Sequence, residues 1–456
     1  MNNIHPNIMY IFPGQGSQYV GMGSDIYTEF ASAREVYQHA SDILKFDVAK
    51  LSFHGPQSQL DRTEFTQPLL LTHSIACLEA LKEQTSNQYP PAVVAGHSLG
   101  EYSALVAAEA LTFEDALKLV QQRGRLMSEF GRGNMAAFRL DRDSLKTLAE
   151  SHYCSIGGCN LPDQTVACGF KEDLDALIGD IISEYGKAKA GRFLNTEGAF
   201  HTYLMISAAE HFRPYLDSTT VHVPRVKVLS NYTGNYHFPE PARIKASLFF
   251  QIFHPVKWMW GLNRAIADGV NTIIEFGGGI GKDRPGEAQS PASRKPNLQG
   301  ITQKTQKASG RDGLYLPAIN SGSLQHTVNS LRILQNFVSI PQDTINTNGT
   351  WLDEKLYCLH IPVRNHITSQ NALELSSQVQ GMGLDSFVQT IGEPYDHNIE
   401  HLQSSCDANI MDAEPYLEVI IGGTTGAVLL YRGDEIVREL RELRRTLEHR
   451  GYVFAA

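Results

Sequence analysis

The feature that most constrains the fold is a serine placed between two glycines, where a short apolar run gives way to a helical pattern. Residues 93–96 (VVAG) are typical of a buried strand, and the alanine-rich residues after Gly100 are typical of a helix. A G-x-S-x-G sequence in this setting is typical of a nucleophilic serine on a sharp strand-to-helix turn. The alternative is a tight turn in which Ser98 only caps the helix. Both interpretations require a strand–turn–helix unit, which predicts an α/β domain with a parallel sheet.

The rest of the first 280 residues continues this alternation and contains one insert. Residues 8–12 (IMYIF) predict a buried strand, and helical patterns follow up to residue 130. From about 134 to 195 the predicted order is strand, helix, two strands, helix and strand, which is the ferredoxin-like arrangement. We therefore predict one domain at residues 1–280, in which a large parallel-sheet, hydrolase-like subdomain carries an inserted ferredoxin-like subdomain.

The composition changes after residue 280. Residues 281–312 are poor in apolar side chains and carry seven Lys or Arg against three Asp or Glu, which predicts a basic linker or an ordered surface arm. Residues 313–456 mix helical and strand patterns and predict a C-terminal α+β extension, whose function no motif indicates. Residues 341–456 hold most of the protein's negative charge, with eight Lys or Arg against seventeen Asp or Glu.

Composition argues against several classes of function. A net charge of −10 argues against a nucleic-acid partner. No apolar stretch approaches the length of a membrane span, and the first residues lack the basic cluster and apolar core of an export signal, so we expect no membrane partner and a cytoplasmic location. The six cysteines include no C-x-x-C pair and the histidines form no H-E-x-x-H motif, so we expect no metal site.

A serine hydroxyl needs a base to act as a nucleophile at neutral pH. His97 is adjacent to Ser98 but is expected to point away across the turn. His201 comes where the chain returns from the insert to the larger subdomain, which brings it within range of the turn. Taken alone, His201 is more typical of a structural histidine in the core, so the residues leave the base open.

Five segments, taken in order, resemble one family. They are IFPGQGSQYVGMG (11–23), GHSLGEYSALVAAEAL (96–111), QQRGRLM (121–127), GAFHTYLM (198–205) and QIFHPVKW (251–258). Together they closely resemble the malonyl-CoA:acyl-carrier-protein transacylases and the acyltransferase domains of polyketide synthases. The segment after residue 279 resembles the one that follows the catalytic core in free-standing, trans-acting acyltransferases of polyketide synthases. Two departures are EFGGGIG (275–281), where the bacterial enzymes have G-P-G, and a C-terminal part that extends well beyond their compact core.

The resemblance implies a Ser–His dyad. It assigns Ser98 as the acyl-accepting nucleophile and His201 as the base, which in this family is oriented by a backbone carbonyl, here that of Gln251. The backbone N–H groups of Gln15 and Leu99 are the implied oxyanion donors. The glycines beside Gln15 then have a purpose, because this backbone must approach the reacting carbonyl closely.

The resemblance also implies the substrate. Arg123 is expected to bind the free carboxylate of malonate through a bidentate contact that lysine cannot reproduce. The Phe200 ring is expected to crowd the position of the extra methyl of methylmalonate. Asn160 and Asn231 match asparagines near the mouth of the active site.

The implied activity is that of an acyl-carrier-protein S-malonyltransferase with a ping-pong mechanism. Malonyl moves from malonyl-CoA to Ser98 and then to the phosphopantetheine thiol of an acyl carrier protein, supplying polyketide or fatty-acid synthesis, with no bound cofactor. The alternatives are a hydrolase that clears stalled acyl groups from carrier proteins, an α/β-hydrolase-type esterase, and a scaffold with a vestigial enzyme. An esterase is disfavoured because its histidine comes late in the domain, and a scaffold because Ser98, Arg123 and His201 are all present.

The basic stretch 281–312 is a candidate docking surface for an acidic carrier protein. Its basic residues are Lys282, Arg284, Arg294, Lys295, Lys304, Lys307 and Arg311. The alternative is a solvated linker whose charges only maintain solubility.

Overall fold

The computed structural model describes residues 7–281, 290–311 and 313–338, together with three strands farther along the chain. Apart from Ala267–Gly269, the described residues up to 338 form one compact unit, and the three later strands belong to a second. The predicted docking residues Lys282 and Arg284, and the helical pattern near the C-terminus, lie outside the described residues.

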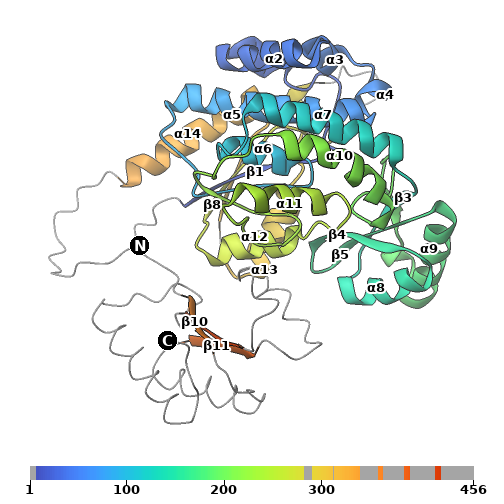
Figure 1. The fold of residues 1–456 in the computed structure, drawn as a ribbon. Coiled ribbons are helices and arrows are strands. Elements are labelled where there is room, and N and C mark those ends of the chain that lie inside the picture. The colour runs from blue at the N-terminus through green and yellow to red at the C-terminus, as the bar shows by residue number, and fades with distance from the viewer. Residues whose placement is uncertain are drawn as a thin grey trace. The chain divides into compact units, whose positions relative to one another are not determined.

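A five-stranded parallel sheet forms the centre of the first unit (Figure 1). Its strand order is β7 (Lys227–Val228), β2 (Val93–Gly96), β1 (Ile8–Phe12), β8 (Thr272–Phe276) and β9 (Leu314–Ala318). Every neighbouring pair is parallel. Both faces of β1 are buried, which is why its sequence is apolar throughout and does not alternate with polar residues. The predicted α/β class is confirmed.

Helices cover both faces of this sheet. Tyr10 and Phe12 of β1 point into the larger core cluster, whereas Met9 and Ile11 point into a second cluster on the opposite face. The first face is covered by α2 (Ala31–Leu44), α5 (Thr63–Thr85), α6 (Gly100–Ala107), α7 (Phe113–Phe130), α10 (Ile206–Ser218), α11 (Pro241–Gln251) and α14 (Ser321–Val338). The second face is covered by α12 (Trp258–Ala267) and α13 (Gln299–Ala308).

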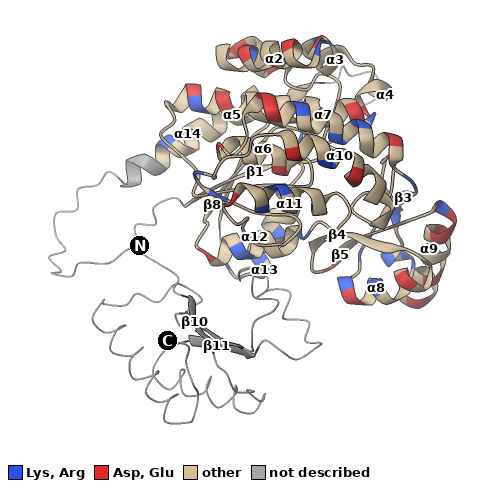
Figure 2. Cartoon of the chain, viewed as in Figure 1, with Lys and Arg blue, Asp and Glu red and all other residues tan. Residues whose placement is uncertain are grey.

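The predicted ferredoxin-like insert is present. Its elements are β3 (Asn134–Phe138), α8 (Arg142–Ser151), β4 (Ser155–Leu161), β5 (Gln164–Gly169), α9 (Lys171–Tyr185) and β6 (Arg192–Phe193). The antiparallel sheet has the order β4-β5-β3-β6, and α8 and α9 bury Leu145, Leu174 and Leu177 in a core of their own. Figure 2 shows acidic and basic residues along α7 and α9, as expected for helices that bury one face and expose the other.

The remaining described elements are short. In the first unit they are α1 (Ser24–Glu29), α3 (Val48–His54), α4 (Gln57–Leu60) and the 3-10 turns Lys187–Lys189, Tyr203–Met205 and Pro291–Ser293. The second unit has an antiparallel sheet in which β12 (Tyr416–Gly422) lies between β10 (Cys358–Pro362) and β11 (Asp385–Thr390). Among the described residues, no helix combines the length and apolar character needed to cross a bilayer.

The boundaries predicted at residues 280 and 313 differ from the structure. The strand β9 extends the central sheet by pairing with β8, and Leu324, Val328 and Leu331 of α14 are fully buried against it. The described part of 281–312 is also packed against the core. The buried side of α13 consists of Thr302, Thr305 and Gln306, which explains why an apolar periodicity was missing from the sequence.

Candidate active site

Ser98 lies on a sharp turn between β2 and α6, with a backbone φ of 51°. This left-handed conformation is strained for a residue with a side chain, and such strain is concentrated at functional turns. The flanking glycines are required by close backbone contacts. A Cβ on Gly96 would lie 1.8 Å from the Gly100 carbonyl oxygen, and one on Gly100 would lie 2.2 Å from the Phe12 carbonyl oxygen. The turn therefore holds Ser98 at the carboxyl ends of β1 and β2, where open α/β sheets bind ligands.

His201 is the base candidate that the fold brings to Ser98. Its Nε2 lies 2.7 Å from Ser98 Oγ, and its Nδ1 lies 2.7 Å from the backbone oxygen of Gln251. Because a carbonyl can only accept, Nδ1 carries the proton and donates to it, which leaves Nε2 free to accept from the serine hydroxyl. Burial lowers the pKa of His201 to about 3, and the nearby Arg123 guanidinium adds to this effect. The imidazole is therefore neutral at physiological pH and is in the state that a base requires.

Arg123 lies on α7 beside this pair and is only 1% exposed. Its Nη1 donates to Gln67 Oε1 at 2.9 Å, and its Nη2 donates to Gln251 Oε1 at 3.0 Å and to Ser98 Oγ at 3.3 Å. The Nε atom is buried and has no hydrogen-bond partner among the described residues. A buried guanidinium that is held by neutral acceptors and keeps a free N–H is suited to bind an anion next to Ser98.

The loop after β1 packs directly on the nucleophile turn. A Cβ on Gly14 would lie 2.5 Å from the backbone oxygen of His97, so only glycine allows this approach. The Gln15 side chain donates to Thr63 Oγ1 at 3.1 Å, which anchors the loop to α5. Within the described residues, the backbone N–H groups of Gln15 and Leu99 have no hydrogen-bond partner. Both are available as donors for an oxyanion.

His97 points away from Ser98, as its position in the turn predicted. Its Nε2 lies 2.9 Å from Asn160 Oδ1, and its ring packs against Trp258. Asn160 is therefore part of the support for His97 and is half-buried. Phe200, which precedes His201, is buried in the main core cluster. Its predicted contact with the acyl group stays a prediction.

Asn231 does not lie at the mouth of the site, and that expectation was wrong. It is 2% exposed, its Oδ1 accepts from the Ser98 backbone N–H at 2.6 Å, and its Nδ2 donates to the Gly96 carbonyl at 2.7 Å. Both groups of its amide are thus used to brace the nucleophile turn. Asn231 follows the short strand β7, more than a hundred residues beyond Ser98, so no local sequence signal connected it with the turn.

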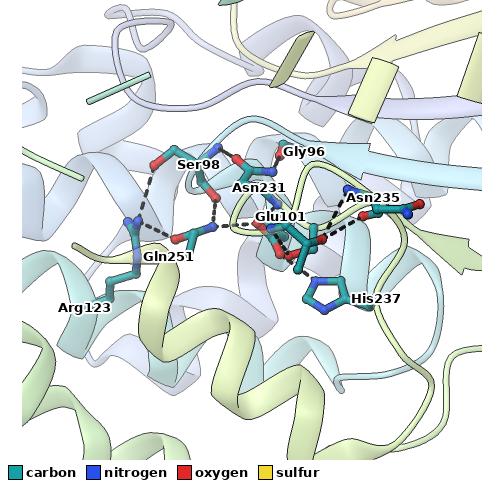
Figure 3. A network of polar contacts seen from close by, with 10 residues as sticks. Gly96, Ser98, Glu101, Arg123, Asn231, Asn235, His237 and Gln251 are labelled. Carbon is teal, nitrogen blue, oxygen red and sulfur yellow. Dashed lines mark hydrogen bonds and ion pairs between the residues drawn. The ribbon is translucent and has the colours of Figure 1, made fainter. Parts of the chain in front are cut away.

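Several polar residues behind the site were missed in the sequence (Figure 3). Glu101 is fully buried and contacts both His237 and Gln251. The Gln251 side chain reaches Ser98 and Arg123, whereas the sequence assigned a role only to its backbone oxygen. One signal was available. Glu101 is the only charged residue among residues 100–107, which are otherwise mostly small or apolar.

Residues 9–276 match the model of the acyl transferase domain family. The chain belongs to this family. The match covers the central sheet up to β8 and the ferredoxin-like insert, and it includes every residue of the site described above.

The curated relatives of this acyl transferase described below carry one activity in their names. This chain is 39% identical over 299 residues to a malonyl CoA-acyl carrier protein transacylase of Bacillus subtilis, and the match covers 64% of this chain and 90% of the relative. It is 38% identical over 279 residues to the polyketide biosynthesis malonyl CoA-acyl carrier protein transacylase PksC of the same organism, covering 60% of this chain and 93% of PksC.

Solved structures show the same fold. The malonyl CoA-acyl carrier protein transacylase of Clostridium perfringens superimposes with a TM-score of 0.64 at 29% identity, covering 73% of this chain and 99% of the other. A malonyl-transacylase solved in complex with AntF, a type II polyketide synthase acyl carrier protein, superimposes with a TM-score of 0.62 at 28% identity, covering 71% and 99%.

Proposed function

We propose that this acyl transferase moves a malonyl group from malonyl-CoA, through an ester on Ser98, to the phosphopantetheine thiol of an acyl carrier protein. The observation that carries the proposal is the buried Arg123, whose Nη2 donates to Ser98 Oγ beside His201 and whose Nε–H has no hydrogen-bond partner among the described residues. An acyl group with a free carboxylate supplies the partner that this guanidinium lacks. A neutral acyl group leaves the buried donor unsatisfied, which favours malonyl over acetyl.

In the first half-reaction, His201 Nε2 takes the proton of Ser98 as Oγ attacks the thioester carbonyl of malonyl-CoA. The resulting oxyanion lies against the N–H groups of Gln15 and Leu99. The C–S bond then breaks, and the imidazolium returns its proton to the departing sulfur of coenzyme A. The product is a malonyl ester on Ser98, and the base is neutral again.

The second half-reaction runs the same steps in reverse with another thiol. His201 takes the proton from the phosphopantetheine thiol, and the thiolate attacks the ester carbonyl. The bond between the acyl carbon and Ser98 Oγ breaks, and His201 returns its proton to the serine. The two thioesters are similar in energy, so the reaction needs no cofactor and follows ping-pong kinetics.

Two observations support the transferase over a hydrolase of stalled acyl groups. Arg123 is built into the core, held by Gln67 and Gln251, and selects a carboxylated acyl group that an enzyme clearing assorted acyl chains does not need. The names of the relatives include transacylases and no such hydrolase among those described above.

The polyketide setting is the finer part of the proposal. PksC is named for polyketide biosynthesis, and one similar structure contains a polyketide synthase carrier protein. We infer that the partner of this chain is a carrier protein or carrier domain of such a synthase. A cytoplasmic location fits this role, and the four described cysteines, all buried, are free thiols as expected in a reducing compartment.

The direct test is incubation of the full chain with radiolabelled malonyl-CoA, with and without a holo acyl carrier protein. Label is expected on the enzyme alone in the first case and to move onto the carrier in the second. If no label reaches the enzyme, or if malonate is released as fast with water as with the carrier, the transferase assignment is wrong.

A further inference from the structure

A buried carboxylate lies directly behind the catalytic pair. Glu101 comes one helical turn after Ser98, in the first turn of α6, and its side chain is fully buried. A buried carboxylate is costly unless several donors satisfy it. Its surroundings therefore show what it is retained for.

Three donors converge on Glu101. His237 Nε2 lies 2.6 Å from Oε1, while the Asn231 backbone N–H and the Gln251 Nε2 lie 3.1 Å and 2.7 Å from Oε2. Because an ionised carboxylate only accepts, the His237 ring donates through Nε2. The other ring nitrogen, Nδ1, is buried without a hydrogen-bond partner among the described residues (Figure 3).

This arrangement determines which way the Gln251 amide faces. Its NH2 group is held between two acceptors, Glu101 Oε2 and the Ser98 carbonyl oxygen at 2.9 Å. The opposite end of the amide, Oε1, must then face Arg123, where it accepts from Nη2 at 3.0 Å. If the amide turned over, its NH2 would face the guanidinium and its oxygen would face Glu101 Oε2 and the Ser98 carbonyl oxygen, so all three contacts would pair like with like.

The same residue also holds the base, because the backbone oxygen of Gln251 accepts from His201 Nδ1. Gln251 is thus the one described residue that contacts Ser98, His201 and Arg123 through hydrogen bonds. Whatever fixes its side chain therefore also fixes Arg123 relative to the Ser98 turn, while its backbone oxygen holds His201.

We propose that Glu101, anchored by His237, is the positioning residue of this site: through the Gln251 amide it fixes Arg123 where the acyl carboxylate must bind. The inference rests on the proposed malonyl transfer and adds the origin of its selectivity. Unlike the acid of a hydrolytic triad, Glu101 makes no hydrogen bond to His201, whose Nδ1 is held by the Gln251 backbone oxygen, and it acts through the Gln251 side chain. The length of the Glu101 side chain is decisive, because one carboxylate must contact Gln251 and His237 at the same time.

Two substitutions separate reach from charge. Glu101→Asp keeps the negative charge but retracts the carboxylate by one methylene, so it can no longer hold both neighbours. Glu101→Gln removes the charge but keeps the length. Its amide oxygen still accepts from Gln251, and its NH2 donates to His237 once the ring proton moves to the unpartnered Nδ1.

The measurement is kcat/KM for malonyl-CoA and for acetyl-CoA in the full-length enzyme. For Glu101→Asp, the malonyl-to-acetyl ratio is expected to fall by about tenfold, the size of a lost charge-assisted hydrogen bond. Glu101→Gln is expected to lower the ratio less than Glu101→Asp does. If Glu101 had only a structural role, its substitution would change the amount of folded enzyme and leave the malonyl-to-acetyl ratio of kcat/KM unchanged.

Glu275→Asp is the matched control. Glu275 is another fully buried glutamate of the same sheet domain, and its hydrogen bonds go to Asn297, Leu298 and Tyr315, away from Ser98. Its retraction is expected to lower the melting temperature while the ratio remains that of the parent. Should Glu101→Asp fail to fold, Gln251→Met takes its place, because it removes the Arg123 acceptor but keeps the backbone oxygen that holds His201.

The inference is overturned if Glu101→Asp, or Gln251→Met in its place, has the parent ratio, or if Glu101→Gln lowers the ratio more than Glu101→Asp. The first outcome means that the Gln251 amide does not position Arg123. The second means that the charge of the Glu101 carboxylate matters more than its length. The behaviour of the parent enzyme distinguishes a failure of the proposed function from a failure of the role proposed for Glu101. If it fails to take malonyl from malonyl-CoA, the proposed function is wrong, whereas a malonylated parent with an unchanged variant ratio refutes only the role of Glu101.

Discussion

Two regions of the catalytic unit are each organised around a buried glutamate, and they use it differently. At the active site, Glu101 accepts hydrogen bonds from two side chains and one backbone N–H, and it holds the Gln251 side chain in one orientation. The second region is the segment 290–338 together with β8, where Glu275 accepts from the backbone N–H groups of Asn297 and Leu298 at the start of α13 and from the Tyr315 hydroxyl of β9.

The two glutamates therefore have different consequences, one for the stability of the fold and the other for the reaction. Glu275 joins three elements that complete the sheet domain, so its loss should weaken the fold without altering the reaction. Glu101 orients groups that meet the substrate, so its loss should alter the reaction even where the fold survives. Substitutions in each region test whether stability and selectivity are in fact separate.

The largest effect is expected at Ser98. Ser98→Ala removes one oxygen from a turn whose shape is set by Gly96, Gly100 and Asn231, so labelling by malonyl-CoA should disappear while the melting temperature stays close to that of the parent. Intact-protein mass spectrometry after incubation with malonyl-CoA measures this directly. A Ser98→Ala protein that still becomes malonylated would show that another residue is the nucleophile.

The next effect is expected at Arg123. Arg123→Ala removes the buried partner of the acyl carboxylate, which should cost on the order of 2–5 kcal/mol of malonyl specificity and leave acetyl transfer or hydrolysis relatively favoured. The ratio of kcat/KM for malonyl-CoA to that for acetyl-CoA is the quantity to compare. An unchanged ratio would remove the basis for the substrate class.

In the second region, Leu324→Ala should act on stability alone. Leu324 of α14 is fully buried in the main core cluster, and truncating such a leucine costs about 2–5 kcal/mol of unfolding free energy. Denaturant unfolding measures the loss, and labelling by malonyl-CoA per folded molecule should match that of the parent. A large change in the malonyl-to-acetyl ratio would mean that the two regions are coupled.

The stability of the second region should also depend on pH. Burial raises the pKa of Glu275 from 4.5 to about 8, against the opposing effect of the Leu298 and Asn297 N–H groups. Between these values the folded state keeps a proton that the unfolded state has lost, so this group's contribution falls as pH rises from about 4.5 to about 8. Thermal unfolding of the parent and of Glu275→Gln across this range should show a steeper decline in the parent. Parallel curves would contradict it.

The smallest effect is expected on the surface of the second region. The structure removes Arg294 from the docking hypothesis, because it is only 8% exposed, donates to the Gly281 carbonyl and stacks on Tyr19. Lys304 and Lys307 of α13 are exposed. If they guide an acidic carrier, Lys304→Glu with Lys307→Glu should slow transfer to the carrier severalfold at low salt and leave self-malonylation of Ser98 unchanged. Equal transfer rates at low salt would make this segment a purely structural one.

Much of the fold could be predicted from the sequence because its signals are local. The Ser98 turn could be predicted from the glycines at 96 and 100, where the close approach of two backbones leaves no room for a Cβ atom. The insert could be predicted because each of its elements has a clear strand or helix period. The segment 290–338 could not be assigned to the sheet, because α13 buries threonines and a glutamine, and nothing near β9 in the sequence identifies β8 as its neighbour.

For the site, the residues alone predicted a serine on a strand-to-helix turn, and the family resemblance implied the roles of His201, Arg123 and the Gln251 backbone oxygen. The side-chain contacts that hold these groups became visible in the folded chain. Gln251 lies 150 residues from Glu101 and 153 from Ser98, and Asn231 lies 133 from Ser98. The physical reason is that buried polar groups must find partners wherever the fold places them. Pairings of this kind arise from packing and leave no periodic or local trace in the chain.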